Sequence, residues 1–173
     1  HQIPPGAADV VHYRFTIPET ATGSIEVSVS LRYRKFDTAY MHLFQGERFR
    51  GNDLPIVTLA SDRIVFPVGG TKTTRTAPNI PAWERWNDYG IGMLRKPDRG
   101  ALRQAEEAFR HVTDLGRADG DLNLARVMIR EGRLDEAGVA LRSAASLGAH
   151  PWLVAWFGGL VDLQNGELDA AIS

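Results

Sequence analysis

The side chains that could catalyse a reaction or bind a metal are scattered along this 173-residue sequence. Histidines stand at positions 1, 12, 42, 111 and 150, and no two of them have the helical i, i+4 spacing or the strand i, i+2 spacing that would bring both to one metal ion. The sequence has no cysteine, which excludes thiolate catalysis and cysteine-based zinc sites. We therefore expect no catalytic residues, no metal site and no enzyme activity in this chain.

Two further patterns resemble functional motifs only superficially. Glu106-Glu107 and Asp135-Glu136 are adjacent carboxylates on predicted helices, where neighbouring side chains point about 100° apart and cannot face each other across a cleft. The run 68–73, Val-Gly-Gly-Thr-Lys-Thr, lacks the Gly-x4-Gly-Lys-Ser/Thr spacing of a phosphate-binding loop. We interpret the carboxylates as surface charges and the glycine-rich run as a flexible linker.

Charge and hydropathy argue against two classes of partner. The 20 Lys and Arg residues nearly cancel the 21 Asp and Glu residues, so no net positive field attracts a polyanion. The longest apolar runs, such as 152–163, are shorter than the ~20 residues that span a bilayer. We expect neither nucleic-acid binding nor membrane insertion. Because the chain begins without methionine and ends inside a periodic helical segment, we also expect it to be part of a longer protein.

The first seventy residues have the two-residue periodicity of β-strands. Apolar and polar side chains alternate in residues 9–17 and most clearly in 25–33. Shorter strands are predicted at 40–44, 56–59 and 63–68, each bounded by Gly, Pro, Asn or Asp. These strands predict an all-β domain over residues 1–75, built as a small antiparallel sandwich or partial barrel. A linker over residues 76–81 follows.

Residues 82–173 have helical periodicity and repeat at a constant offset of about 34 residues. The segment 132–137 (GRLDEA) matches 166–171 (GELDAA) at Gly, Leu, Asp and Ala, and the same offset relates Ala125 to Gly159. Recurring small side chains allow antiparallel helices to approach to ~8–10 Å. The C-terminal half is therefore predicted to be all-α, with units at about 82–118, 119–152 and 153–173, the last of them truncated.

These positions resemble the tetratricopeptide repeat. In the middle unit, Ala125 stands at the small position of the first helix, and Ala137, Leu141 and Ala144 stand at the small, large and small positions of the second. An earlier unit begins at Trp86 with a longer turn between its helices. The resemblance implies an α-solenoid of helical hairpins whose first helices line a concave surface that binds a protein or peptide.

The same resemblance implies a set of partner-binding residues on that concave surface. They are Asn87, Ile91 and Arg95 from the first unit and Leu122, Arg126 and Arg130 from the second. Three arginines favour an acidic or carboxylate-bearing ligand, and solvated surface arginines are the alternative. The carboxylate clamp that binds chaperone tails has Lys and Asn where Asn87 and Ile91 stand, so we do not expect chaperone binding.

The N-terminal half is similar to a second group of proteins. The runs 3–7 (IPPGA), 11–15 (VHYRF) and 31–36 (LRYRKF), followed by the repeats, look like the C-terminal region of bacterial multihaem cytochrome c proteins. In that family the haems are attached upstream, and this chain has no attachment motif, so we expect no cofactor here. The resemblance implies haem c in the parent protein, electron transfer and a periplasmic or extracytoplasmic location. It also makes His12 and His42 candidates to cap a neighbouring haem, with solvated histidines as the alternative.

The main functional hypothesis is a non-catalytic scaffolding module. Its repeats would bind a protein or peptide, with an acidic one favoured, or another domain of the same parent chain. The alternative is a haem-free accessory segment of a periplasmic multihaem cytochrome c. A third hypothesis, carbohydrate binding by the β-domain, rests on fold analogy alone.

Overall fold

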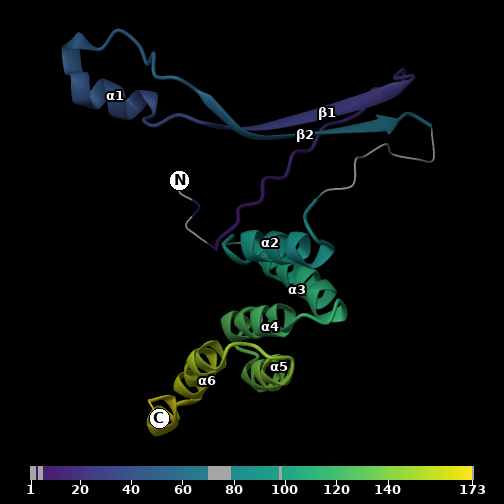
Figure 1. Cartoon of the computed structure of the whole chain (residues 1–173), viewed down its shortest axis with the longest axis vertical. Coiled ribbons are helices and arrows are strands. Elements are labelled where there is room, and N and C mark those ends of the chain that lie inside the picture. The colour runs from purple at the N-terminus through teal and green to yellow at the C-terminus, as the bar shows by residue number, and fades with distance from the viewer. Residues whose placement is uncertain (1–2, 4–5, 70–78, 98, 173) are drawn as a thin grey trace. The chain divides into compact units, whose positions relative to one another are not determined.

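The computed structural model describes residues 3, 6–69, 79–97 and 99–172. The chain divides into a ribbon unit, residues 15–77, and a helical unit, residues 78–173 together with residues 1–14. Residues 70–73 of the predicted flexible run and residues 76–78 of the predicted linker lie outside the described residues. The elements are β1 (Ser24–Tyr33), α1 (Thr38–Gln45), a 3-10 turn (Gly46–Arg48), β2 (Val57–Pro67), α2 (Ala82–Leu94), α3 (Arg99–Asp114), α4 (Ala118–Glu131), α5 (Leu134–Ser146), α6 (Pro151–Asn165) and α7 (Leu168–Ala171) (Figure 1).

The ribbon unit contains a two-stranded antiparallel sheet. Strand β1 pairs with β2 so that Ile25 lies opposite Phe66, with a register shift after Leu31. Residues directly opposite each other share a face of the sheet. Ile25, Val27 and Leu31 lie opposite Phe66, Ile64 and Ala60, so one face is mostly apolar, with Asp62 opposite Val29. The other face is mostly polar, with Val65 opposite Glu26, and carries the ion pair between Arg63 and Glu26, at 2.5 Å. None of the described side chains of this unit is buried.

The structure corrects the predicted sandwich or partial barrel, because the described residues contain one sheet of two strands. Residues 9–17 form no strand, and four of the apolar side chains of that segment are exposed, those of Val11, Tyr13, Phe15 and Ile17. Residues 40–44 are helical in α1, because the Asp37 side chain caps that helix by accepting a hydrogen bond from the Tyr40 N–H, at 2.7 Å. The two short strands predicted at 56–59 and 63–68 form the single strand β2.

The helical unit buries a continuous apolar core. Phe109, Val112 and Val127 are its largest fully buried side chains. A Cβ atom added to Gly90 would lie 2.4 Å from the Phe109 ring, so this close contact between α2 and α3 requires a residue without a side chain. The four alanines that recur along the helices are completely buried: Ala105, Ala125, Ala137 and Ala144. The recurring small residues therefore lie at the helix contacts.

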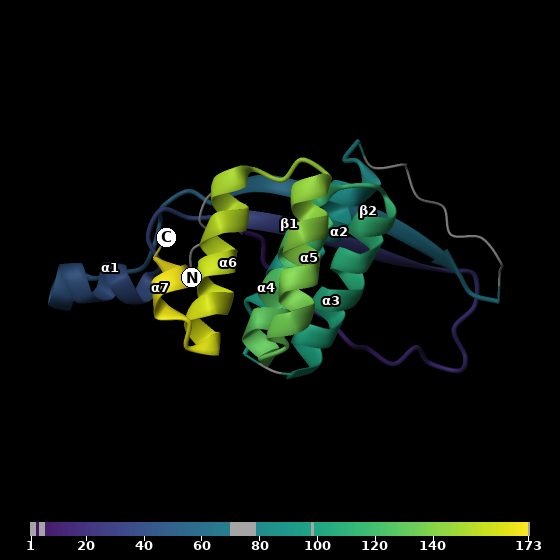
Figure 2. The ribbon, with the colours of Figure 1, turned by 90° about the horizontal axis from the view of Figure 1, so that it is seen from below.

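Each helix of this unit contacts its neighbours in the sequence, and α4 also contacts both α2 and α6. Figure 2 shows the helices following one another across the unit from α2 to α7. Gly132 and Gly166, which the repeat offset relates, end α4 and α6 with left-handed backbone conformations, at φ 75° and 83°. Glycine ends helices in this conformation because it has no Cβ to clash. The repeat offset in the sequence thus relates equivalent helix ends.

The N-terminal segment belongs to the helical unit and lies against α2. The Asp9 carboxylate is 2.6 Å from the Lys96 ammonium. A Cβ atom on Gly92 would lie 2.6 Å from the Val10 side chain, so Gly92 lets the segment approach the helix backbone. This packing holds the segment in place without any strand pairing.

Candidate functional site

A chain of polar contacts links α2, α4 and α6 on one side of the helical unit. Asn87 accepts a hydrogen bond from the side-chain amide of Asn123, at 2.8 Å. Asn123 in turn accepts one from the Arg126 guanidinium, at 2.7 Å, and that guanidinium lies 5.7 Å from the centre of the Phe157 ring. Arg130 donates a hydrogen bond to the Leu94 carbonyl at the end of α2. We call these residues the inner face: Asn87, Asn123, Arg126, Arg130 and Phe157.

The inner face carries positive charge without an internal counterion. Among the described residues, no carboxylate lies within 4.0 Å of the Arg126 or Arg130 guanidinium. Arg126 is half-buried, and this burial lowers the pKa of its guanidinium. Arginine side chains stay protonated in proteins, so Arg126 keeps its positive charge. A guanidinium has five N–H donors, so each arginine keeps donors for a ligand beyond the bond just described. Carboxylates match this donor geometry best.

The other three predicted residues lie elsewhere. Ile91 is half-buried and packs against the core. Arg95 is 3.5 Å from the carbonyl oxygen of Ala8 and therefore interacts with the N-terminal segment. Leu122 is almost fully buried and lines a separate hollow formed with the α3–α4 and α5–α6 turns. The structure thus brings together Asn87, Arg126 and Arg130.

Arg95 also lies in a different electrostatic environment from the other two arginines. The pKa of the Asp9 carboxyl is lowered chiefly by its hydrogen bond from Lys96 and then by the Val10 N–H, and the positive charge of Arg95 contributes further. An acidic neighbour is therefore already present near Arg95. Arg126 and Arg130 are the arginines of the predicted set that keep their charge available to a partner.

Asn123 and Phe157 belong to the inner face but were not predicted from the sequence. Asn123 is buried and follows Asn87 by 36 residues, the same spacing that separates Arg130 from Leu94. A search at the 34-residue repeat offset does not pair Asn87 with Asn123, because the longer α2–α3 turn adds residues to the first unit. A search for paired asparagines at a variable offset would have found Asn123. Nothing in the sequence distinguishes Phe157 from the other aromatic residues of α6.

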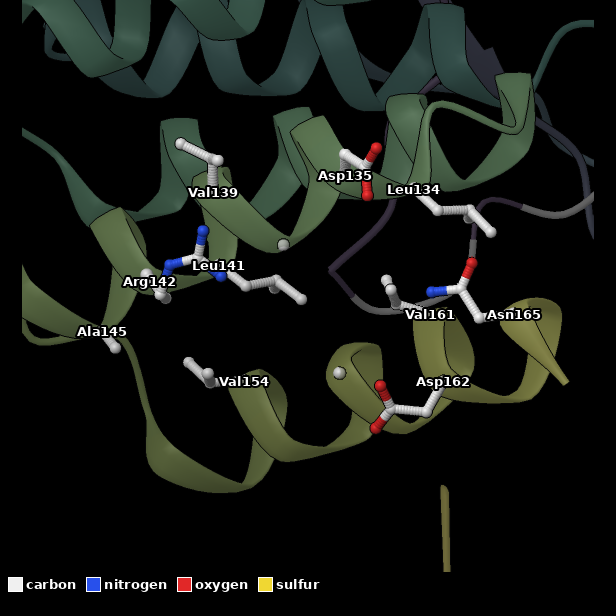
Figure 3. A pocket seen from close by; sticks show the side chains of 12 residues that line it. Leu134, Asp135, Val139, Leu141, Arg142, Ala145, Val154, Val161, Asp162 and Asn165 are labelled. Atoms are coloured by element: carbon white, nitrogen blue, oxygen red, sulfur yellow. The ribbon is translucent and has the colours of Figure 1, made fainter. Parts of the chain in front are cut away.

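A second hollow, of about 530 Å³, lies between α5 and α6 (Figure 3). Its apolar lining includes Leu141 and Val161, which are buried. Arg142 from α5 and Asp162 from α6 lie around its margin. The volume is in the range of small-molecule sites, which are mostly apolar with a few polar groups. No residue predicted from the sequence to bind a partner lines it.

The two histidines that were candidates to cap a haem both contact aromatic rings. The His12 imidazole is 3.4 Å from the Tyr89 hydroxyl. His42 packs edge-on against Phe49, with 5.2 Å between the ring centres. In the described part of the chain, no group of three or more His, Asp or Glu side chains could hold a metal ion.

No protein-family model, curated protein or solved structure matches the sequence. Within the described residues, no helix is both long and apolar enough to cross a membrane. Any functional proposal must therefore rest on the geometry of the two units.

Proposed function

We propose that the helical unit is a non-catalytic protein-interaction module that binds an acidic segment of a partner across the inner face. The observation that carries this proposal is the pair of arginines without a counterion, Arg126 and Arg130. Burying an unpaired charge is unfavourable, so binding of a carboxylate to a half-buried guanidinium lowers the free energy. Asn123 fixes the position of Arg126 before the partner arrives, which lowers the entropy lost on binding.

The fold that we propose for this module is a tetratricopeptide-type α-solenoid. Its support is the agreement between a sequence repeat and helix contacts. The alanines repeated in the sequence are buried between helices, and the repeated glycines end α4 and α6. A stack of such hairpins presents its first helices on one surface, which is where α2, α4 and α6 carry the inner face.

The ribbon unit supports a second interaction, with another domain or protein. Leu31 and Leu59 are more than half exposed. The mostly apolar face of the sheet, which includes Leu31, is not covered by any described residue of its own unit. A two-stranded sheet is marginally stable by itself in water. We propose that this face packs against another domain of the parent chain or a partner protein.

A fluorescence anisotropy titration tests the inner-face proposal. The probe is a labelled peptide rich in Asp and Glu, and a Gln- and Asn-rich peptide of equal length is the uncharged control. We expect Arg126→Glu to weaken binding of the acidic peptide at least tenfold, about 1.4 kcal/mol. The charge-matched control Arg103→Glu changes an exposed residue of α3 and should alter the affinity less than twofold. Equal affinity of Arg126→Glu and the unmodified protein, or equal binding of both peptides, would reject the proposal.

A further inference from the structure

The α5–α6 junction can be compared position by position with the α3–α4 junction. Ala105 of α3 corresponds to Ala137 of α5, and both are completely buried. Val127 of α4 corresponds to Val161 of α6 at the repeat offset, and both are buried as well. The same alignment, continued along each helix, pairs Glu106 with Gly138, Arg110 with Arg142, and Leu124 with Gly158.

At the α3–α4 junction, the first members of these pairs carry side chains where the α5–α6 junction has two glycines. Leu124 is only 5% exposed and belongs to the hydrophobic core. The Glu106 carboxylate accepts charge-assisted hydrogen bonds from Arg110, at 2.5 Å, and from Arg133, at 2.9 Å. This junction therefore holds both an aliphatic side chain and a carboxylate of its own.

The α5–α6 junction lacks both groups. A Cβ atom on Gly158 would meet no other atom within 4 Å, so the space that a leucine would fill is open. A Cβ atom on Gly138 would meet only the Arg142 guanidinium, at 3.5 Å. Within the described residues, Arg142 has no ion pair, whereas the equivalent Arg110 has one with Glu106. The 530 Å³ hollow of Figure 3 lies at this place.

We propose that the α5–α6 hollow binds a small monocarboxylate with a branched aliphatic body of leucine size. The carboxylate would pair with Arg142, as Glu106 pairs with Arg110. The second arginine that holds Glu106, Arg133, corresponds to Glu167, so one ion pair alone would hold the ligand. The aliphatic body would lie over Gly158, on the apolar floor that Leu141 and Val161 form, as Leu124 lies in the equivalent junction. Asp135 and Asp162 also line the hollow and repel any anion, which limits the affinity for a monocarboxylate and disfavours dicarboxylates most.

Two kinds of ligand carry a carboxylate beside an aliphatic body. One is a free aliphatic carboxylate, and the other is the C-terminal residue of a peptide when that residue is aliphatic. An NMR titration of the intact chain distinguishes them. The free probe is 4-methylpentanoate, with 4-methylpentanamide as the uncharged control. The peptide probe is an acetylated tripeptide ending in leucine, with its C-terminal amide as control. Tighter binding of the free-acid peptide than of 4-methylpentanoate would identify the peptide source.

We expect 4-methylpentanoate to shift backbone amide signals in residues 138–142 and 158–162, with a Kd on the order of 1 mM. Its uncharged amide should bind at least tenfold more weakly. Arg142→Gln should weaken carboxylate binding to the same degree, while the matched control Arg110→Gln, at the filled junction, should leave it unchanged. The proposal is wrong if the carboxylate and the amide bind equally, or if Arg142→Gln binds the carboxylate as the unmodified chain does.

A filled variant gives an independent test based on stability. Gly138→Glu combined with Gly158→Leu restores the two groups of the α3–α4 junction. We expect this double variant to lose carboxylate binding and to melt roughly 5 °C or more above the unmodified chain, because it adds packing and replaces two helical glycines. Gly158→Ala, which adds helix propensity without filling the hollow, should retain binding. Carboxylate binding by the double variant, or a lower melting temperature, would contradict the equivalence of the two junctions.

Discussion

The two units of this protein use apolar residues in opposite ways. The helical unit buries them, with Phe109, Val112 and Val127 completely enclosed. The ribbon unit exposes them, and none of its described side chains is buried. Both units have well-formed secondary structure, so the difference lies in packing. Regular hydrogen bonding alone does not make a segment independently stable, since most of the free energy of folding comes from burial of apolar surface.

This difference predicts a graded response to substitution. Changes in the helical unit should cost free energy in proportion to the contacts they remove. Equivalent changes in the ribbon unit should cost little unless another protein surface covers it.

The largest effect is expected from Ala137→Arg. Ala137 has no exposed surface, so an arginine there would place an unpaired charge and a long side chain at a close helix contact. We expect a loss of at least ~4 kcal/mol and of cooperative melting followed by circular dichroism. Val139→Arg, at an exposed position of the same helix, should change the unfolding free energy by less than ~0.5 kcal/mol. A melting curve of Ala137→Arg that matches the unmodified chain would contradict the helix packing described here.

The next effect compares one substitution in both units. Leu141 is 4% exposed and Leu31 is 55% exposed. Leu141→Ala should lower the unfolding free energy by about 2–5 kcal/mol, since it leaves a cavity. Leu31→Ala should lower it by less than ~1 kcal/mol, since its side chain already meets solvent. Urea denaturation measures both, and similar losses would show that the ribbon face is covered after all.

A smaller effect is expected at the buried carboxylate of Asp121. It accepts hydrogen bonds from Thr113, at 2.9 Å, and from Ser143, and so ties α4 to both α3 and α5. Asp121→Ala removes the acceptor for both hydroxyl groups and should cost about 1–3 kcal/mol. A double-mutant cycle with Ser143→Ala should give a coupling energy of at least ~0.5 kcal/mol. Additive losses would mean that the two side chains stabilise the unit separately.

The smallest effect concerns acid. The hydrogen bond from Arg133 is the main cause that lowers the pKa of the Glu106 carboxyl, and burial opposes it. A carboxyl with a lowered folded-state pKa contributes stability above its unfolded pKa, about 4.3, and loses it as pH falls through the folded value. Glu106→Gln should therefore flatten the fall in stability below pH 4.3, by about 1 kcal/mol or less. Urea denaturation midpoints measured between pH 2 and 7 give this dependence. If the stability of Glu106→Gln and of the unmodified chain falls identically below pH 4.3, Glu106 makes no contribution.

The sequence predicted the helical unit better than the ribbon unit for a physical reason. A buried helix contact requires a small residue at a fixed position, so Ala125 and Ala137 mark the packing in the sequence itself. Alternation of apolar and polar residues indicates an extended chain with two faces but says nothing about whether a partner strand exists. Residues 9–17 alternate and remain unpaired. Residues 40–44 were predicted to form a short strand, and local capping by Asp37 makes them helical.

The candidate site was predicted in part for a related reason. Asn87, Arg126 and Arg130 follow from the helical face that a repeat presents, whereas Leu122 on the same unit is buried. The hydrogen bond that Asn123 makes with Asn87 depends on the relative positions of α2 and α4 along their axes. The 34-residue repeat offset does not include this pair, because Asn87 and Asn123 are 36 residues apart.

Hydrogen exchange on the intact chain tests the central contrast between the two units most directly. Amides of α3, α4 and α5 should exchange slowly, because they open only when the packed unit unfolds. Amides of β1 and β2 should exchange at least a hundredfold faster, because a two-stranded ribbon without buried side chains opens locally. Equal protection of the strands and of α3 to α5 in the isolated chain would contradict this account.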